Sequence, residues 1–505
     1  MERSSSGANP LEAMLLRPID PGILFAIFLV FAVFLRWDTF GDPNLHGDEV
    51  FYHTVGLAMH QGSIPYVDVW DRKPLGLFTI FYLIGFLSDH VVAYQITATI
   101  FTAVTAFVIA KVCFDLDRLS ECDRPPAPTG TVGPLLAGLA YLLWLAPLGA
   151  YGGQSPVWYN LFIAVAAWLV VRSIPDLRRG KTPAALLLAM LTAGTAITLK
   201  QTAFFEAAFL GGYAICLLYR SEAGHFRAVC QALIWALIGA APALLISLAY
   251  AIIGHWDEYW QAMVLANLDK PQHWPTALTR ATGITLYIAP LLIAAFMGLS
   301  QRTGEPRKFV ILWIVAAIVG LCSVPQFYLH YALPLTVPLA VAASPFFSRG
   351  ALGVGALVAM AILTFSYAPW LPGHTIKSQA AIARLQNVTV NHLGEGPLLL
   401  YDAPPQLYRL TEQPMLTPLV FPTHLAHAIE RNMSSLDTME ETQRVIALRP
   451  AVVVMAAPPR NAPINEETHQ VVLHYVQKYC REIETVSVPE RERRDNITVW
   501  GDCTP

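Results

Sequence analysis

Eleven apolar stretches dominate this chain of 505 residues and decide what it can fold into. Their lengths approach or reach the roughly 17 to 25 residues that cross a bilayer as one helix. Lipid offers no partner to an unpaired backbone amide, so each stretch is expected to be helical. Charged residues make up 14% of the chain, against roughly 25% in a soluble domain, which excludes an ordinary soluble enzyme. The stretches are 20–37, 91–112, 132–149, 158–173, 183–200, 202–219, 229–253, 280–299, 308–325, 330–347 and 351–371.

Charge is concentrated at the C-terminal end of the chain. Residues 375–505 hold 12 Lys and Arg and 15 Asp and Glu, whereas residues 1–374 hold only 21 of each class. We therefore expect an all-α polytopic membrane domain over 1–374 and a small, water-facing α/β domain over 375–505. In the second domain, short apolar strands alternate with amphipathic helices. The expected strands are PLLLYD, AVVVMA, ETVSVP and ITVW, and the expected helices are AAIARLQNVTVNHL, the segment around 438–448 and ETHQVVLHYVQKYC.

Composition argues against several kinds of partner. The net charge is −3 and there is no basic stripe, so nucleic acid is not expected as a partner. His46, His53 and His60 are seven residues apart, about two helical turns, which is too far for one metal ion. We therefore expect no metal site at these histidines and no essential cofactor, and the sequence leaves a divalent metal open without supporting one. Of the seven cysteines, only Cys480 and Cys503 are placed to form a bridge in an export compartment, and the sequence leaves that pairing open.

The short apolar segment 74–88 determines the topology. Lys and Arg accumulate in short cytoplasmic loops. If 74–88 crossed the membrane, the basic run Arg178-Arg179-Gly180-Lys181 would face outward, whereas an interfacial or re-entrant segment puts every concentrated basic loop on one side. We therefore expect 74–88 on the outer face of the cytoplasmic membrane, with the N-terminus inside and the C-terminal domain outside. The basic loop residues are Arg118, Arg124, Arg172, Arg178, Arg179, Lys181, Arg220, Arg227, Arg302, Arg307, Lys308 and Arg349.

Two further expectations follow from this topology. The apolar run after Arg3 and Arg17 is a retained first span, since no small-residue cleavage site follows it. The outward segments include 254–279, whose tryptophans suit either an interfacial helix or a plain aromatic belt. The other outward segments are 38–90, 150–157, the turn around Lys200, the turn around Gln326, and 372–505.

The first outward loop is the most informative stretch. Asp48 and Glu49 follow the first span, and Asp71, Arg72 and Lys73 precede the segment 74–88. An exposed loop is expected to carry charge, so a plain solvated loop is one interpretation. The alternative is a positioned cluster, because aromatic residues interleave with the charges and a proline directly follows Lys73. Carboxylates facing cations at the membrane surface could activate a hydroxyl and stabilise a departing phosphate.

The order of these motifs resembles the integral-membrane GT-C glycosyltransferases. The matching elements are the acidic pair Asp48-Glu49, the basic-proline motif Arg72-Lys73-Pro74 and the late run from Phe327 to Pro334. The resemblance covers residues 20–372 and is greatest to protein O-mannosyltransferases and to bacterial transferases that modify lipopolysaccharide with aminoarabinose or galacturonic acid. It implies transfer of a sugar from a polyprenyl-phosphate carrier to a lipid, glycan or protein hydroxyl.

The resemblance also implies roles for residues. Asp48 would be the general base in an inverting reaction, and Glu49 would assist or orient the acceptor. The carrier phosphate would be met by cations and by an aromatic-histidine pair that converge in one outward chamber. The residues expected at that phosphate are Arg72, Lys73, Lys200, His330 and Tyr331, and those expected at the sugar or acceptor are Tyr52, Asp71, Gln154, Gln201 and Gln326.

Lys200 also attracts attention on physical grounds. A lysine near a membrane boundary is costly unless it is paired or reaches the interface, and Glu206 follows one to two turns later as a possible partner. The chain departs from the resembling family at Phe51, where some relatives carry an arginine, and at Gln154, where many carry a carboxylate. A transporter or flippase of lipid-linked saccharides is the alternative from another class, although no internal repeat is evident. A non-catalytic scaffold would leave the charged loop unexplained.

Overall fold

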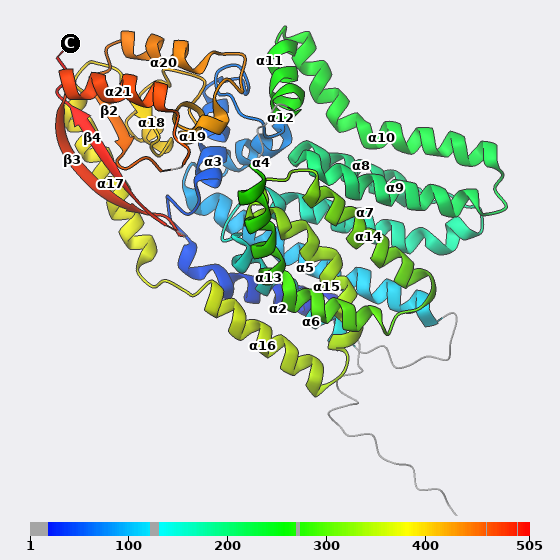
Figure 1. Cartoon of the computed structure of the whole chain (residues 1–505). Coiled ribbons are helices and arrows are strands. Elements are labelled where there is room, and N and C mark those ends of the chain that lie inside the picture. The colour runs from blue at the N-terminus through cyan, green and yellow to red at the C-terminus, as the bar shows by residue number, and fades with distance from the viewer. Residues whose placement is uncertain (1–18, 122–130, 269–272, 461, 492, 505) are drawn as a thin grey trace, which may run out of the picture. The chain divides into compact units, whose positions relative to one another are not determined.

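The computed structural model describes residues 19–121, 131–268, 273–460, 462–491 and 493–504 (Figure 1). Its contacts divide the chain into two compact units. The helix unit comprises the described parts of Met1–Trp37, Ala98–Ala243 and His273–Trp370. The sheet unit comprises the described parts of Asp38–Thr97, Leu244–Gln272 and Leu371–Pro505. Arg3, Arg17 and Arg124, which entered the topology prediction, lie outside the described residues.

Each of the eleven apolar stretches forms one helix. Among the described residues, seven helical segments are long and apolar enough to cross a membrane. Helices α6, α8 and α16 are apolar but shorter, and α14 opens with three charged residues among its first five. The prediction of an all-α polytopic membrane domain is confirmed, with full spanning length and composition in seven of the eleven. The helices are α2 (Pro21–Arg36), α5 (Val91–Glu121), α6 (Val132–Leu145), α7 (Ser155–Arg178), α8 (Ala185–Leu199), α9 (Phe204–Tyr219), α10 (His225–Ile252), α13 (Trp274–Leu299), α14 (Gly304–Cys322), α15 (Leu333–Phe347) and α16 (Ala351–Tyr367).

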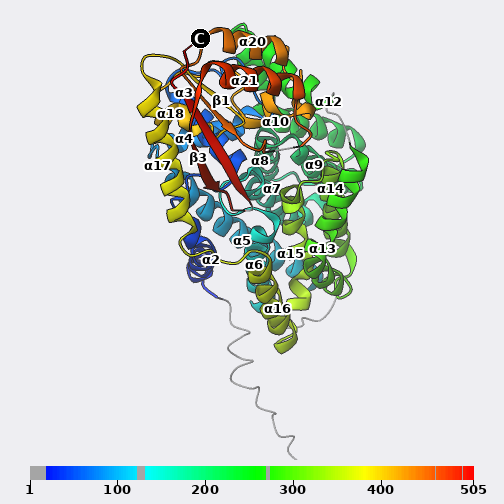
Figure 2. The ribbon, with the colours of Figure 1, turned by 60° about the vertical axis from the view of Figure 1, so that its left-hand side comes forward.

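Helices of the helix unit pack closely side by side. Helix α7 packs against α8 and α9, α14 packs against α9, and α15 packs against α6 and α13 (Figure 2). Between α8 and α10 the backbones touch, because a Cβ on Gly194 would lie 2.0 Å from the carbonyl oxygen of Gly239. In a membrane the hydrophobic effect does not drive helices together, so their association depends on close packing, and small residues such as glycine allow the backbones to approach.

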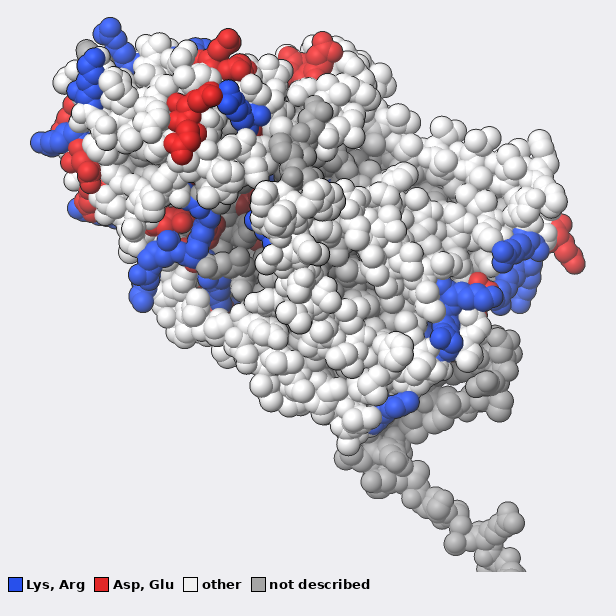
Figure 3. All heavy atoms as spheres, in the orientation of Figure 1, with Lys and Arg blue, Asp and Glu red and all other residues white. Residues whose placement is uncertain are grey.

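The basic loops of the helix unit lie at one end of it. A Cβ on Gly180, which follows α7, would lie 3.2 Å from the Cβ of Ala223, which precedes α10. Arg178 at the end of α7 pairs with Glu305 at the start of α14, at 2.9 Å. Figure 3 shows charged side chains where α9 joins α10 and long white stretches over the helices. The loop after α7, the loop before α10 and the start of α14 therefore share one end of the helix unit.

The sheet unit contains a four-stranded sheet with the order β1-β2-β4-β3. Strand β1 runs parallel to β2, and β4 runs antiparallel to β2 and to β3. Every residue of β1 and β2 is buried, as expected of uninterrupted apolar runs in a covered sheet. The predicted α/β architecture is confirmed. The strands are β1 (Leu398–Tyr401), β2 (Val452–Ala456), β3 (Arg481–Pro489) and β4 (Arg494–Gly501), with helices α17 (His374–Leu393), α18 (Gln406–Leu410), α19 (Pro422–Ala426), α20 (Thr438–Ala447) and α21 (Glu466–Tyr479).

A disulfide joins Cys480 and Cys503. It ties the end of α21 to the residues just after β4. The pairing that the sequence left open is therefore present in the sheet unit.

The first outward loop groups with the C-terminal residues rather than with the helices. It forms α3 (Gly47–His60) and α4 (Leu75–Gly85), and Arg72 pairs with Glu430 at 2.7 Å. The predicted boundary between 374 and 375 falls on the first residues of α17, but a division by sequence position alone separates residues that contact one another. Ion pairs between segments that lie far apart in the sequence, such as this one, leave no signature in a count of charges along the chain.

Two predicted interfacial segments are short helices. With 11 residues, α4 rises about 16 Å, well below the roughly 30 Å of a hydrocarbon core. This length accords with the prediction that 74–88 does not cross the membrane. Within the segment 254–279, α11 (Trp256–Trp260) is followed by a π-helical turn (Gln261–Leu265) and by α12 (Ala266–Leu268), and residues 274–279 already belong to α13. The exposed rings of Trp256 and Trp260 stack on each other.

Candidate functional site

The acidic pair opens helix α3. Its N-cap is His46, whose Nδ1 accepts a hydrogen bond from the Asp48 amide at 3.1 Å. Acidic residues in a first turn are favoured by the helix dipole. The Asp48 side chain keeps 16% of its surface exposed, whereas Glu49 is fully buried. Asp48 is therefore the member of the pair that a substrate can reach without rearrangement.

Lys73 lies between two carboxylates. Its Nζ is 3.7 Å from Asp48 Oδ1 and 3.3 Å from Asp71 Oδ1, and its backbone amide donates to Asp71 Oδ1 at 2.8 Å. The Tyr66 hydroxyl donates to the Lys73 carbonyl oxygen at 2.9 Å. Pro74 then serves as the N-cap of α4. These bonds hold the charges in place, which favours the interpretation as a positioned cluster over that of a solvated loop.

Two aromatic rings face the same lysine. Its Nζ lies 5.4 Å from the ring centroid of Tyr52 and 5.5 Å from that of Phe421, within the range of cation–π attraction. Burial alone would lower the pKa of Lys73, but the carboxylates of Asp71 and Asp48 outweigh it, and the pKa is raised. The side chain is therefore a cation at neutral pH. A cation at this distance stabilises the ionised form of Asp48, which is the form that a general base needs.

His424 completes this group and was missed by the sequence reasoning. Its Nε2 lies 3.7 Å from Asp71 Oδ2. Burial lowers the pKa of His424 to about 4, although Asp71 and Glu430 oppose the shift, so the ring is neutral at pH 7. The histidine lies in α19 of the C-terminal part, where no motif marks it. Asp48, Asp71, Lys73 and His424 are called the lysine cluster below.

Arg72 points to a different partner from that of its neighbour Lys73. Its Nη2 lies 2.7 Å from Glu430 Oε1, and the two side chains are only 14% and 10% exposed. The two cations of the dibasic motif therefore have different acidic partners, Glu430 for Arg72 and the pair Asp48 and Asp71 for Lys73. The prediction that both cations meet a carrier phosphate is untested, and in this conformation Arg72 ties the first loop to the segment after α19.

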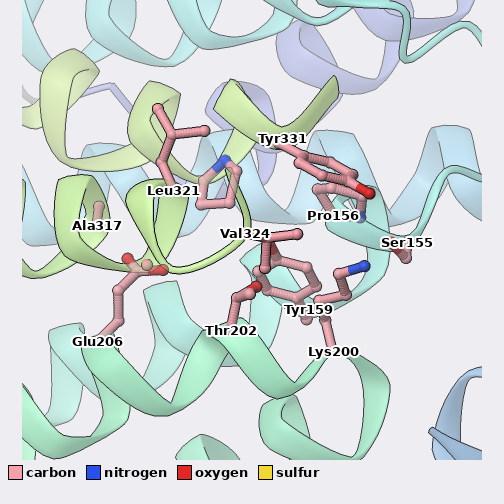
Figure 4. A pocket seen from close by; sticks show the side chains of 12 residues that line it. Ser155, Pro156, Tyr159, Lys200, Thr202, Glu206, Ala317, Leu321, Val324 and Tyr331 are labelled. Carbon is pink, nitrogen blue, oxygen red and sulfur yellow. The ribbon is translucent and has the colours of Figure 1, made fainter. Parts of the chain in front are cut away.

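A second candidate site is a pocket of the helix unit, seen in Figure 4. Lys200, between α8 and α9, and Tyr331, just before α15, both line it, and the Lys200 Nζ lies 5.2 Å from the centroid of the Tyr331 ring. The pocket joins turns that the topology prediction placed on the outer side. Its lining residues are Ser155, Pro156, Tyr159, Lys200, Thr202, Glu206, Ala317, Gly320, Leu321, Val324, Tyr331 and Pro334. They are called the Lys200 pocket below.

Glu206 also lines this pocket, but it has a neutral partner. The indole of Trp313 on α14 donates to Glu206 Oε1 at 2.8 Å, and in Figure 4 Glu206 and Lys200 lie toward opposite ends of the pocket. The possible ion pair between Glu206 and Lys200 is therefore replaced by a hydrogen bond from tryptophan.

The remaining predicted residues lie around the same end of the helix unit. Gln154 is fully buried and directly precedes the pocket residue Ser155. Gln201 follows Lys200 in a short 3₁₀ turn (Gln201–Ala203). The carbonyl oxygen of Gln326 accepts a hydrogen bond from Arg280 at 3.2 Å.

His330 lies in the 3₁₀ turn Leu329–Ala332. Its ring stacks on Tyr328 and meets Tyr331 edge to face. His330 therefore neighbours the pocket residue Tyr331 but does not itself line the Lys200 pocket.

The predicted residues thus form two groups, one in each unit. Asp48, Asp71, Lys73 and Tyr52 come together in the sheet unit, and Lys200 and Tyr331 come together in the helix unit. That the two groups converge in one chamber stays a prediction. Within the described residues, no group of three or more His, Cys, Asp or Glu side chains is arranged to hold a metal ion.

Comparison with known proteins places the fold. No family model matches the chain, and no curated protein matches it by sequence. A crystal structure of ArnT from Cupriavidus metallidurans bound to undecaprenyl phosphate matches it with a TM-score of 0.58 and 15% identity, over 95% of this chain and 98% of ArnT. The chain has the GT-C fold. The apo structure of the same ArnT also matches, with a TM-score of 0.56 and 14% identity, over 95% of this chain and 98% of ArnT.

A third solved structure is more distant. The archaeal oligosaccharyltransferase AglB from Archaeoglobus fulgidus, in complex with an inhibitory peptide and a dolichol-phosphate, matches with a TM-score of 0.49 and 11% identity, over 86% of this chain and 69% of AglB. The fold class predicted from the order of the sequence motifs is confirmed by the ArnT structures, and the chain is an integral membrane protein of this class.

Proposed function

We propose that this protein is a glycosyltransferase that moves a sugar from a polyprenyl-phosphate carrier to an acceptor hydroxyl at the outer face of the cytoplasmic membrane. The observation that carries the proposal is the position of Asp48, which is partly exposed and lies 3.7 Å from the cation of Lys73. The GT-C fold supports it, since ArnT with this fold was solved with undecaprenyl phosphate bound. The acceptor would be a hydroxyl of a lipid, glycan or protein.

Asp48 is the general base in this proposal. The acceptor oxygen attacks the anomeric carbon, the bond from that carbon to the carrier phosphate breaks, and the acceptor proton passes to Asp48. Attack from the face opposite the phosphate inverts the configuration. Lys73 keeps Asp48 ionised before the proton arrives, because an adjacent cation favours the charged carboxylate. Glu49 is fully buried, so it would assist Asp48 rather than touch the acceptor.

The departing phosphate gains negative charge as its bond to the sugar breaks. Lys200 and Tyr331, which face each other in the Lys200 pocket, offer a cation and a hydroxyl to it. A preorganised cation in a site that excludes water stabilises such developing charge more strongly than it would in water. Arg72, Lys73 and His330 are further candidates for the same phosphate, and Gln154, Gln201 and Gln326 for the sugar. Lysine and arginine can supply this compensation without a metal.

The sidedness of the reaction is part of the proposal. The basic loops share one end of the helix unit, and the positive-inside rule assigns that end to the cytoplasm. The Lys200 pocket, formed by the turns at the other ends of the same helices, then opens on the outer side. Carrier-linked sugars presented at the outer leaflet would meet it there.

The test is sugar transfer by Asp48→Asn. Purified protein is assayed in detergent or liposomes against a panel of polyprenyl-phosphate sugars. The variant should lose about 100-fold or more in kcat, because a positioned general base contributes on the order of 10² to 10⁴. Asp89→Asn is the matched control, since Asp89 belongs to the same outward segment but is 71% exposed in its pair with Arg409.

Both variants should keep the melting temperature of the wild type. Full turnover by Asp48→Asn would reject Asp48 as the base. Movement of an intact lipid-linked saccharide across liposomes, with no transfer to any acceptor, would instead favour the transporter alternative.

A further inference from the structure

The hairpin that joins β3 to β4 is tied to the start of helix α3. Glu490 Oε1, at the tip of the hairpin, accepts a hydrogen bond from the Gly47 amide at 2.7 Å. The side-chain amide of Asn44 donates to the carbonyl oxygen of Pro489 at 3.2 Å. Two contacts therefore connect the last hairpin of the sheet with the residues immediately before Asp48.

Glu490 is itself held firmly. Its backbone amide donates to the Arg493 carbonyl oxygen at 2.8 Å across the hairpin turn. Its other carboxylate oxygen accepts a hydrogen bond from Arg493 Nε and lies 3.6 Å from Arg460 Nη2. Burial would raise the pKa of Glu490, but Arg493 and Arg460 outweigh it and the pKa is lowered. The carboxylate is therefore ionised and fixed at neutral pH.

The target of Glu490 is a backbone donor in the first turn of α3. The first four amides of a helix have no partner within the helix. Here the Asp48 amide is satisfied by the ring of His46, and the Gly47 amide is satisfied by Glu490. The first turn is thus capped by one local residue and by one residue from the far end of the chain. A carboxylate at this position is also favoured by the helix dipole.

We propose that Glu490 is a positioning residue for Asp48. By capping Gly47, the hairpin sets the direction of the turn from which the Asp48 side chain projects toward Lys73. This inference rests on the proposed function, in which Asp48 is the base, and it gives the C-terminal sheet a part in the reaction. Catalytic groups must be held to within about 0.5 Å of their productive geometry, so a loosened first turn should lower turnover more than substrate binding.

The test compares two substitutions at one position. Glu490→Ala removes the cap and both arginine contacts, whereas Glu490→Gln keeps an amide oxygen that can accept from Gly47 and loses only the charge. Both variants should lose thermal stability, because both lose the ion pairs, and Glu490→Ala should lose more, because it also loses the cap on Gly47. Turnover should separate them, with kcat reduced about 10-fold to 100-fold in Glu490→Ala and by less than about 3-fold in Glu490→Gln. The KM for the carrier should stay within about 2-fold in each.

Two further variants serve as control and as second probe. Glu484→Gln removes an ion pair of the same hairpin, since Glu484 lies 2.6 Å from Arg384 on the surface, and its kcat should not change. Asn44→Ala removes the second tie to the hairpin and should lower kcat in the same direction as Glu490→Ala. This variant keeps the proposal testable if Glu490→Ala does not fold.

The outcomes separate this inference from the proposed function. If kcat falls by the same factor in Glu490→Ala and in Glu490→Gln, the hairpin has only a structural role and the inference fails. If Asp48→Asn is inactive while Glu490→Ala and Asn44→Ala turn over normally, the inference fails and the base assignment stands. If Asp48→Asn is active, the base assignment fails. Hydrogen exchange of the peptide covering residues 44–50 gives a readout without turnover, and unchanged protection in Glu490→Ala would overturn the proposed tie.

Discussion

Lys73→Met should destabilise the sheet unit, and a second substitution should restore it. The Lys73 ammonium lies within 4 Å of both Asp48 and Asp71. Asp71 is almost completely buried, with 4% of its side chain exposed. Methionine fills a similar volume, so the substitution removes charge while keeping most of the packing against Tyr52 and Phe421. What remains is a buried carboxylate without its compensating cation.

The magnitude follows from that burial. Removing one partner of a buried ion pair costs about 3 to 5 kcal/mol, because the other charge is left uncompensated. The Lys73 side chain is 20% exposed, which favours the lower end, about 3 kcal/mol. For a unit of about 200 residues this corresponds to a fall in melting temperature of roughly 6 to 12 °C. Adding Asp71→Asn removes the uncompensated charge, so the double variant should recover most of the loss.

Melting temperatures in detergent, followed by intrinsic fluorescence, check this prediction. Arg384→Met is the matched control, since its pair with Glu484 is exposed and exposed pairs contribute little. The double variant should regain stability but not sugar transfer, because Asp48 still lacks its cation. Equal melting temperatures for the single and double variants would refute the reasoning that Lys73 compensates Asp71.

Two predictions concern pH and sidedness. Because burial lowers the pKa of His424 from 6.5 to about 4, unfolded chains bind a proton that folded chains do not, and stability should fall as pH drops from about 6.5 to about 4. His424→Asn should remove about 3 kcal/mol of that loss of stability. A similar loss should remain in the variant because burial also lowers the pKa of His53 to about 4. Equal slopes of melting temperature against pH for the wild type and the variant would contradict this. For topology, Lys181→Cys in a background lacking Cys216, Cys230 and Cys322 should resist an impermeant thiol reagent on intact cells, and Ser487→Cys should react; labelling of Lys181→Cys would reverse the assignment.

Local sequence signals located the first loop but not its partners. The apolar stretches, the strands and the position of Asp48, Asp71 and Lys73 could be read directly, because each depends on residues close in the chain. The proline after Lys73 and the interleaved aromatic residues correctly indicated a fixed cluster. His424 and Glu430 could not be found in this way, since their contacts with Asp71 and Arg72 exist only after the chain folds.

The same limit explains the difference in domain division. A charge count along the chain separates residues before and after 374, and it places the first loop with the helices. The structure groups this loop with the C-terminal sheet because ion pairs and backbone hydrogen bonds, such as that from the Trp70 amide to the Pro418 carbonyl oxygen at 2.9 Å, join segments far apart in sequence. Unremarkable charged residues of a terminal domain can therefore belong to a candidate site.

The charges of the lysine cluster suggest how one lysine can serve both the base and the phosphate. With His424 neutral, the two carboxylates and the single ammonium give a net charge of −1 before reaction, which disfavours a phosphate beside Lys73. When Asp48 accepts the acceptor proton, the cluster becomes neutral and its repulsion of an anion falls. The phosphate gains charge in the same step, as its bond to the sugar breaks. Proton transfer to Asp48 would therefore remove one of the two carboxylates that compete with the phosphate for Lys73, at the moment when the charge on the leaving group develops.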